Sequence, residues 1–166
     1  MPSPEPPDVG ELLRRLAEAG VEFIVVGGAA AVLHGAPITT EDLDIVHRRS
    51  PENVSRLKTL LDELDARVRE LANRRLPPQE SALLGDGHVL LSTNLGPLDC
   101  LGTLIDGRGF DELIFHSETI KDEGVEFLVV DLPTLIELKT KTGRAKDRLM
   151  LPVLVAVAEQ LDDSKR

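Results

Sequence analysis

Residues 21–46 contain the pattern that most restricts the fold of this chain. An apolar run ends at Gly27-Gly28, an alanine-rich segment with a helical pattern follows, and Asp42-Leu43-Asp44 lies in a second apolar run. On a strand, residues two positions apart point to the same face, about 6.5–7 Å apart. Two like charges at that spacing repel each other, so the Asp42–Asp44 pair indicates a cation between its carboxylates.

The glycine pair is expected to lie beside these carboxylates. Residues 29–41, between Gly28 and Asp42, leave room for one short helix and a return turn, which bring the end of the first strand next to the start of the second. Glycines at a strand-to-helix turn let backbone N–H groups approach an anion at the helix N-terminus. An anion cradle beside metal-binding carboxylates favours phosphoryl or nucleotidyl transfer. Each motif alone is ambiguous, because glycine pairs often only end strands and a strand with one wet face can carry two acids.

A third carboxylate, Asp99, lies within an apolar strand pattern at residues 97–101. A buried Asp without a partner is costly, so it needs a cation, a basic side chain or hydrogen bonds. Together with Asp42 and Asp44, it would complete a set of three carboxylates able to hold two divalent cations. The alternative is an Asp at a strand end that bonds to the backbone.

A basic segment near the C-terminus reverses the local sign of the charge. The whole chain has a net charge of −10, whereas residues 137–148 contain Lys139, Lys141, Arg144, Lys146 and Arg148 against two acids. This segment is either a solvated helix face with i,i+4 pairs or an electrostatic partner for a triphosphate.

Composition excludes several classes of protein. The strong negative charge and the absence of Trp and Tyr argue against a nonspecific DNA-binding protein. No apolar run approaches the roughly 20 residues of a membrane span. The only cysteine, Cys100, has Leu98 and Leu101 as neighbours and is expected in the core, which fits a reducing compartment and a cytoplasmic protein.

The pattern of apolar residues predicts one α+β (α/β-like) domain with a mixed β-sheet flanked by helices. We expect a disordered lead-in at residues 1–8, the domain at 9–161, a frayed tail at 162–166 and a loop at 72–87. Pro152 either kinks the last helix or marks its start. Helices are expected at 8–20, 28–34, from Ser50 onward, 132–142 and about 147–161, and strands at 23–26, 43–46, 88–92, 98–101, 115–120 and 125–130.

At this point the sequence resembles a known family. The sequence pattern is similar to that of the nucleotidyltransferase superfamily of the DNA polymerase β type. It consists of Gly-Gly, thirteen further residues, Asp-apolar-Asp and then a distant Asp. The segments GGAAAVLHG, TTEDLDIV, LDCLGTLIDGRGFDEL and LPTLIELKTKTGRAKDRLMLPVL resemble those of small, single-domain nucleotidyltransferase-like proteins of bacteria. Some of these proteins are related to toxin components of toxin–antitoxin systems. The resemblance covers about residues 10–160 and implies the nucleotidyltransferase fold.

The resemblance also implies a role for each site residue. Gly27 and Gly28 would cradle the nucleoside triphosphate (NTP). Asp42 and Asp44 would ligate Mg²⁺, with Mn²⁺ as a possible substitute, and Asp99 would complete a second metal position and help to activate the attacking hydroxyl. Lys139, Arg144 and Lys146 match a basic stretch that faces the nucleotide in relatives.

The implied function is transfer of a nucleoside monophosphate to a hydroxyl, and several points stay open. The sequence does not identify the acceptor, and three classes stay open: a small molecule such as an antibiotic, the end of a tRNA, and a protein side chain. Relatives often have Arg at the position of Ile38 and Asp at the position of Met150. A catalytically weak binding or regulatory module, for example a toxin–antitoxin component with a cognate partner protein, is therefore the alternative. A metal-dependent hydrolase of another fold ranks last, since it would have no use for the glycine pair.

Overall fold

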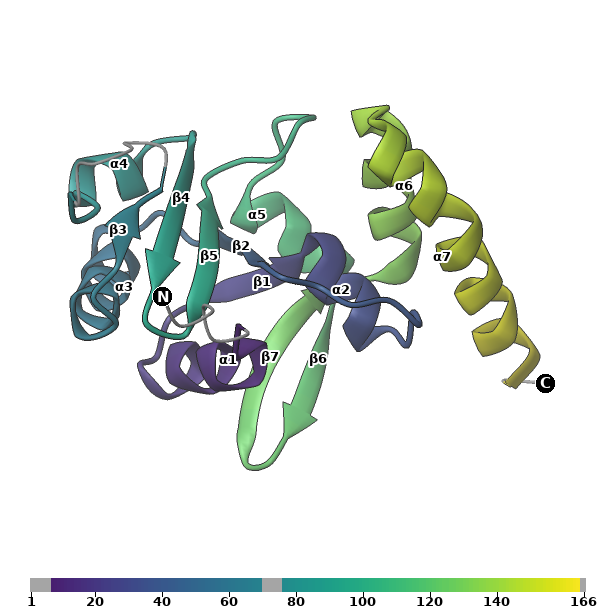
Figure 1. Ribbon diagram of the computed structural model, residues 1–166, viewed down its shortest axis with the longest axis horizontal. Helices are drawn as coiled ribbons and strands as arrows, with labels where there is room; N and C mark the ends of the chain where they lie inside the picture. Colours follow the sequence, from purple (N-terminus) through teal and green to yellow (C-terminus); the bar gives the residue numbers. More distant parts are fainter. Residues whose placement is uncertain (1–6, 70–75, 165–166) are drawn as a thin grey trace, which may run out of the picture.

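The computed structural model describes residues 7–69 and 76–164, which form a layer of strands with helices around it (Figure 1). Within these ranges the α-helices are α1 (Val9–Glu18), α2 (Gly27–Leu33), α3 (Pro51–Glu63), α4 (Glu80–Leu84), α5 (Phe110–Leu113), α6 (Leu132–Thr142) and α7 (Ala145–Ser164), and a 3-10 helix η1 spans Ile114–His116. The strands are β1 (Phe23–Val26), β2 (Leu43–His47), β3 (Arg67–Val68), β4 (His88–Thr93), β5 (Gly96–Leu101), β6 (Ser117–Asp122) and β7 (Val125–Val130).

The strands form one mixed sheet with the order β3-β4-β5-β2-β1-β7-β6. β2 pairs with β5, and β1 with β7, in parallel, whereas the other neighbouring strands are antiparallel. The predicted α+β fold, a mixed sheet flanked by helices, is therefore confirmed. Central strand β1 is buried along its whole length, which is why its four residues are all apolar.

Side chains at helix ends explain where several helices begin and end. Asp8 accepts a hydrogen bond from the Glu11 N–H at 3.0 Å and so caps α1. Ser50 accepts one from the Asn53 N–H at 3.2 Å, with Pro51 as the first residue of α3. Helix α6 ends at Gly143, which has a φ of +65°, and the chain then turns back into α7.

Three short elements lie in segments for which the sequence predicted neither a helix nor a strand. These are β3, α4 and α5. Helix α4 lies inside the predicted 72–87 loop, of which residues 72–75 lie outside the described residues. Its Leu83 side chain is fully buried and its Leu83 carbonyl lies 2.7 Å from Nε2 of His47. Tertiary contacts of this kind, rather than local periodicity, stabilise a helix this short.

The structure describes the chain close to both of its ends. Residues 1–6 of the predicted lead-in lie outside the described residues, but the Asp8 N–H donates to the Leu95 carbonyl at 2.8 Å. Helix α7 begins at Ala145 and runs through Pro152, so the alternative that this helix starts at Pro152 is wrong. No helix in the described part of the chain is long and apolar enough to cross a membrane.

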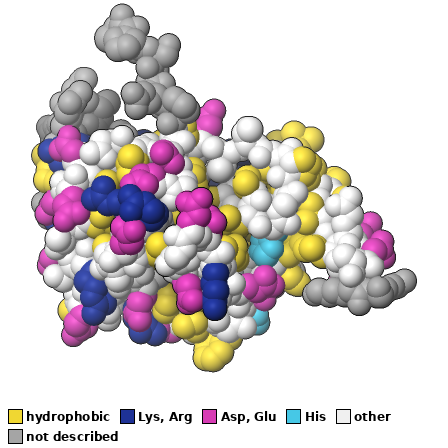
Figure 2. All heavy atoms as spheres, turned by 90° about the horizontal axis from the view of Figure 1, so that it is seen from below, with side chains coloured by type: hydrophobic (Ala, Val, Ile, Leu, Met, Phe, Trp, Pro, Cys, Tyr) yellow, Lys and Arg dark blue, Asp and Glu magenta, His cyan; other side chains and the backbone are white. Residues whose placement is uncertain are grey.

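Charged side chains are mixed on the face of the molecule shown in Figure 2. Lys and Arg side chains lie there among Asp and Glu side chains, and they form no continuous basic surface over the described part of that face. The described part of this face therefore lacks the basic stripe or patch to which a nucleic-acid backbone binds.

Candidate active site

Three carboxylates converge at the neighbouring strands β2 and β5. Asp44 lies directly opposite Asp99 in the parallel register of these strands and opposite Val26 of β1 on its other side. Asp42 precedes β2 by one residue. One carboxylate oxygen from each of the three Asp residues lies within 4.8 Å of the others. The structure therefore brings together the three acids that the sequence singled out, and this group can hold a metal ion.

Asp44 is the member of this cluster that most needs a cation. Its Oδ1 atom is buried and has no hydrogen-bond partner. Burial raises the pKa of this carboxyl to about 7, with further contributions from the charge and hydrogen bond of Asp99 and the charge of Asp42. An orphaned carboxylate oxygen among three acids fits a hard divalent cation, which prefers oxygen ligands.

The Gly27-Gly28 turn lies against the carboxylates, as expected. Gly27 begins α2 with a φ of +66°, and a Cβ at this position would lie 2.5 Å from Oδ2 of Asp44. A Cβ at Gly28 would lie 3.2 Å from Oγ1 of Thr40, whose hydroxyl donates to the Asp42 carbonyl at 2.9 Å. Only glycine at position 27 therefore allows Asp44 to lie beside the start of α2.

Gly27→Ala is expected to lower the free energy of unfolding by about 2–4 kcal/mol and to weaken divalent-cation binding. The new methyl group would be strained by the positive φ and would also displace the Asp44 carboxylate. Gly143→Ala is the matched control, because Gly143 has nearly the same φ, +65°, and a Cβ at that position would meet no atom within 4 Å. It should cost only about 1 kcal/mol. Urea unfolding and Mn²⁺ titration measure both effects, and equal costs for the two variants would contradict the close approach.

Basic side chains from α6, from α7 and from the turn between them reach the same cavity as the acids. This cavity has a volume of about 440 Å³. Of the residues predicted for the site, Gly28, Asp42, Asp44, Asp99, Lys139, Arg144 and Lys146 line it. Gly27 lines an adjoining cavity of about 400 Å³ that shares Asp44, Lys139 and Arg144 with the first. Ile38 and Met150, the two positions at which the resemblance departs from the family pattern, also line the first cavity.

Asp147 binds two of these basic residues and was not identified from the sequence. Its side chain is 1% exposed, and its two oxygens lie 2.9 Å from Nζ of Lys139 and 2.9 Å from Nε of Arg144. The Thr142 hydroxyl donates to it as well. Burial favours the neutral form, but hydrogen bonds from Thr142, Lys139 and Arg144 outweigh it and lower the pKa of Asp147 to about 2.

Arg69 is a second residue that the sequence did not reveal. One of its guanidinium nitrogens lies 2.7 Å from Oδ1 of Asp99 in an ion pair, and another donates to the Leu91 carbonyl at 2.6 Å. The Arg69 N–H also bonds to the carbonyl of Leu90, the β4 residue that pairs with Asp99. Arg69 thus places one positive charge against the acidic cluster, at the Asp that was predicted to complete the second metal position.

Comparisons with known proteins agree with this arrangement of strands and helices. No family model and no curated protein matches the sequence, but solved structures match in three dimensions. The nucleotidyltransferase-like protein TM1012 from Thermotoga maritima matches with a TM-score of 0.54 and 18% identity, over 89% of this chain and 90% of its own. The lincosamide antibiotic adenylyltransferase LnuA, solved with lincomycin, matches with a TM-score of 0.62 and 12% identity, over 92% of this chain and 99% of its own.

The chain has the nucleotidyltransferase fold. The resemblance read from the sequence is thereby confirmed at the level of the fold, while the roles of the individual site residues remain predictions.

In this nucleotidyltransferase fold Cys100 is fully buried on β5, and burial raises the pKa of its thiol, which confirms it as a core residue rather than a nucleophile. His34 follows α2, and its Nε2 lies 2.7 Å from the Val130 carbonyl.

Proposed function

We propose that this protein transfers a nucleoside monophosphate from an NTP to a hydroxyl group, with Mg²⁺ or Mn²⁺ bound by Asp42 and Asp44. The observation that carries the proposal is the cluster of three carboxylates beside the glycine turn, with an orphaned oxygen on Asp44. The adenylyltransferase LnuA, which has the same fold, supports this class of reaction. The bound cation would neutralise phosphate charge and orient the phosphates.

Other groups at the first cavity would bind the phosphates and accept the proton of the attacking hydroxyl. Lys139, Arg144 and Lys146 line it together with the acids and would bind the outer phosphates of the NTP. The start of α2 would present backbone N–H groups to the same phosphates. Asp99 lies beside Asp44 and would accept the proton of the attacking hydroxyl. Catalysis would rest on positioning and charge neutralisation, as in other phosphoryl transfers.

The alternative is a catalytically weak binding or regulatory module, such as a toxin–antitoxin component with a partner protein. Two observations favour it. Asp147 already neutralises part of the charge of Lys139 and Arg144. The apolar Ile38 and Met150 at the cavity wall add no phosphate or metal contacts. Such a module would bind the nucleotide and the partner without turning the nucleotide over.

A transfer assay separates the two functions. The protein is incubated with α-³²P-labelled NTPs and Mg²⁺, together with small-molecule, tRNA and protein fractions of a bacterial lysate. We expect a labelled product and released pyrophosphate, both lost with EDTA and in Asp42→Asn. Mg-NTP binding by calorimetry without any labelled product would support the module instead. Loss of both binding and transfer would contradict the two functions together.

A further inference from the structure

The second cavity, of about 400 Å³, adjoins the acids on a mainly apolar side of the site. It shares Asp44, Lys139 and Arg144 with the first cavity. Its other walls come largely from aliphatic side chains of β5, the loop that follows β5, and α6. These are Leu101, Leu104, Ile105, Leu135 and Leu138. A polar cavity and an apolar cavity thus meet at the same carboxylate.

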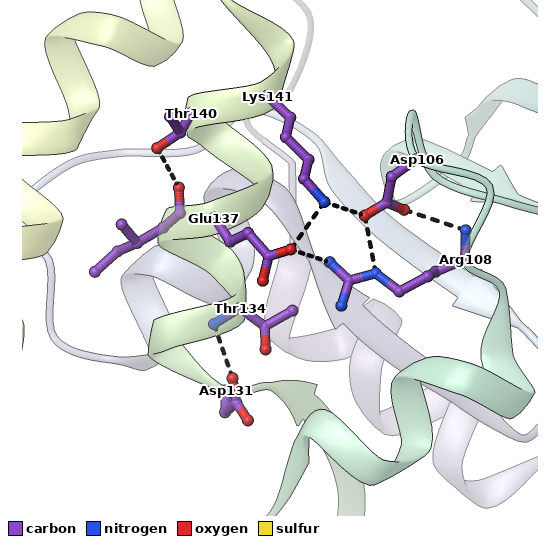
Figure 3. A network of polar contacts seen from close by, with 8 residues as sticks. Asp106, Arg108, Asp131, Thr134, Glu137, Thr140 and Lys141 are labelled. Carbon is purple, nitrogen blue, oxygen red and sulfur yellow. Dashed lines mark hydrogen bonds and ion pairs between the residues drawn. The ribbon is translucent and has the colours of Figure 1, made fainter.

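A network of charges connects the loop after β5 to α6, the two elements that supply most of the apolar wall (Figure 3). Lys141 of α6 donates to Asp106 at 3.1 Å and to Glu137 at 2.8 Å. Arg108 donates to the same two acids, at 2.8 Å and 3.2 Å. The network ties the loop after β5 to α6. A single exposed ion pair contributes little, but four linked charges restrain one another and keep the loop, with Ile105, at the cavity.

Ile105 is the exposed apolar residue of this wall. Its side chain is 61% exposed, in contrast to Leu135 and Leu138, which are 1% and 8% exposed. Exposed apolar surface at the rim of a cavity is stabilised when a ligand covers it, and binding pockets of small molecules are concave and mainly apolar in this way. Charged phosphates would gain nothing from this wall, so its ligand is an uncharged group of one of the reactants.

Resting on the proposed transferase function, we infer that the apolar cavity is the acceptor subsite, and that the acceptor is a small molecule with a hydroxyl on an uncharged, apolar body. A volume of about 400 Å³ lies in the range of cavities that enclose drug-sized ligands, not polymers. Within the described part of the chain, the cavity is lined by no Phe, Tyr or Trp on which an RNA base could stack, and His88 is the one ring among its lining residues. The net charge of −10 also opposes an RNA acceptor.

In-line displacement places the two reactants in the two cavities. The oxygen of the acceptor hydroxyl forms a bond to the α-phosphorus while the bond from that phosphorus to the β-bridging oxygen breaks. Pyrophosphate leaves with the bonding electron pair, and the hydroxyl proton goes to a carboxylate of the cluster and then to water. The entering and leaving oxygens lie on opposite sides of the phosphorus. If pyrophosphate leaves into the first cavity, the acceptor therefore approaches from the second cavity.

The first test measures binding without any nucleotide. Cyclohexylmethanol, an uncharged alcohol with an apolar ring, is titrated into protein with ¹³C-labelled Ile and Leu methyl groups. We expect saturable shifts of the Leu104, Ile105 and Leu138 signals. Ile105→Gln should weaken this binding about 5–10-fold, since part of the apolar contact is lost. Phe115→Gln is the control, because Phe115 is 83% exposed and lines neither cavity.

The second test follows the labelled nucleotide into the acceptor. Label in small hydroxylated molecules, reduced by Ile105→Gln through a higher KM for the acceptor and an unchanged KM for the NTP, supports the subsite. Label only in tRNA or protein overturns the acceptor assignment and leaves the transferase function intact. Shifts confined to other leucines, or the same affinity in Ile105→Gln, also overturn it. If no NTP-derived label is transferred at all, the transferase function fails and the subsite fails with it.

Discussion

Asp44→Asn is expected to lower nucleotidyl transfer at least about 10³-fold and yet to make the metal-free protein more stable. Asp44 lies between Val26 and Asp99 in the sheet, faces Asp42, and has a buried oxygen without a hydrogen-bond partner. Its charge is therefore useful only when a cation is bound. Without one, removing the charge relieves burial and repulsion, which should raise the free energy of unfolding by about 1–3 kcal/mol at pH 8.

The pH dependence identifies the cause of this gain. The pKa of Asp44 is about 7 in the folded protein, against an ordinary value of 3.8. Between about pH 4 and pH 7 the folded protein holds a proton that the unfolded chain has released. Stability therefore falls as the pH rises through this window, provided that no metal is bound. In Asp44→Asn this component of the slope should disappear. Urea unfolding in EDTA at pH 5, 6, 7 and 8 measures it.

Asp42→Asn is the matched control for this prediction. Asp42 belongs to the same cluster but is not buried, so its replacement should weaken cation binding with little change in the stability of the metal-free protein. If Asp44→Asn instead destabilises the metal-free protein by several kcal/mol, Asp44 is a structural hydrogen-bonding residue and the metal site is wrongly assigned.

The part of the site that could be predicted is the part encoded in short segments. Asp42 and Asp44 share a face because side chains alternate along a strand, and Gly27 lies beside them because only one short helix separates the two motifs. Asp99 was identifiable as an acid in an apolar strand, but its position opposite Asp44 depends on the pairing of β2 with β5. That pairing joins segments more than fifty residues apart and leaves no local signal.

The contacts of Arg69 and Asp147 at the site could not be predicted, because both depend on tertiary structure. Arg69 reaches Asp99 only because β3, β4 and β5 lie side by side, and a strand of two residues has no readable periodicity. Asp147 looked like one of two acids on a basic helix. Its burial follows from the turn at Gly143, which folds α7 back against α6 and places Asp147 beside Lys139. Local charge counts cannot distinguish a solvated acid from a buried one.

Asp147→Ala is expected to lower the free energy of unfolding by about 3–4 kcal/mol at pH 7. The carboxylate is 1% exposed and accepts hydrogen bonds from Lys139, Arg144 and Thr142. Lys139 is itself only 11% exposed, so the variant leaves a nearly enclosed ammonium group without its counter-ion. Since Lys139 lines both cavities, its loss of position should also weaken NTP binding.

The pH dependence of the free energy of unfolding at acidic pH gives an independent measure of the contribution of Asp147. The pKa of Asp147 is lowered from 3.8 to about 2, so the unfolded chain binds a proton before the folded protein does. This carboxylate therefore contributes about 2 kcal/mol above pH 4, and the contribution is lost as the pH falls from about 4 to about 2. The gap in stability between the wild type and Asp147→Ala should narrow over that window and stay constant between pH 5 and pH 8.

Two further variants test whether the loss of stability in Asp147→Ala comes from the buried charge of Asp147, and not from the removal of any acid on α7. Glu159→Ala removes an exposed carboxylate from the same helix and should change the free energy of unfolding by less than about 0.5 kcal/mol. Asp147→Asn keeps the shape and an acceptor for Thr142 but removes the charge, so its cost should fall between those of the two alanine variants. An Asp147→Ala variant as stable as Glu159→Ala would mean that Lys139 and Arg144 are not held by Asp147 and are free to bind phosphate.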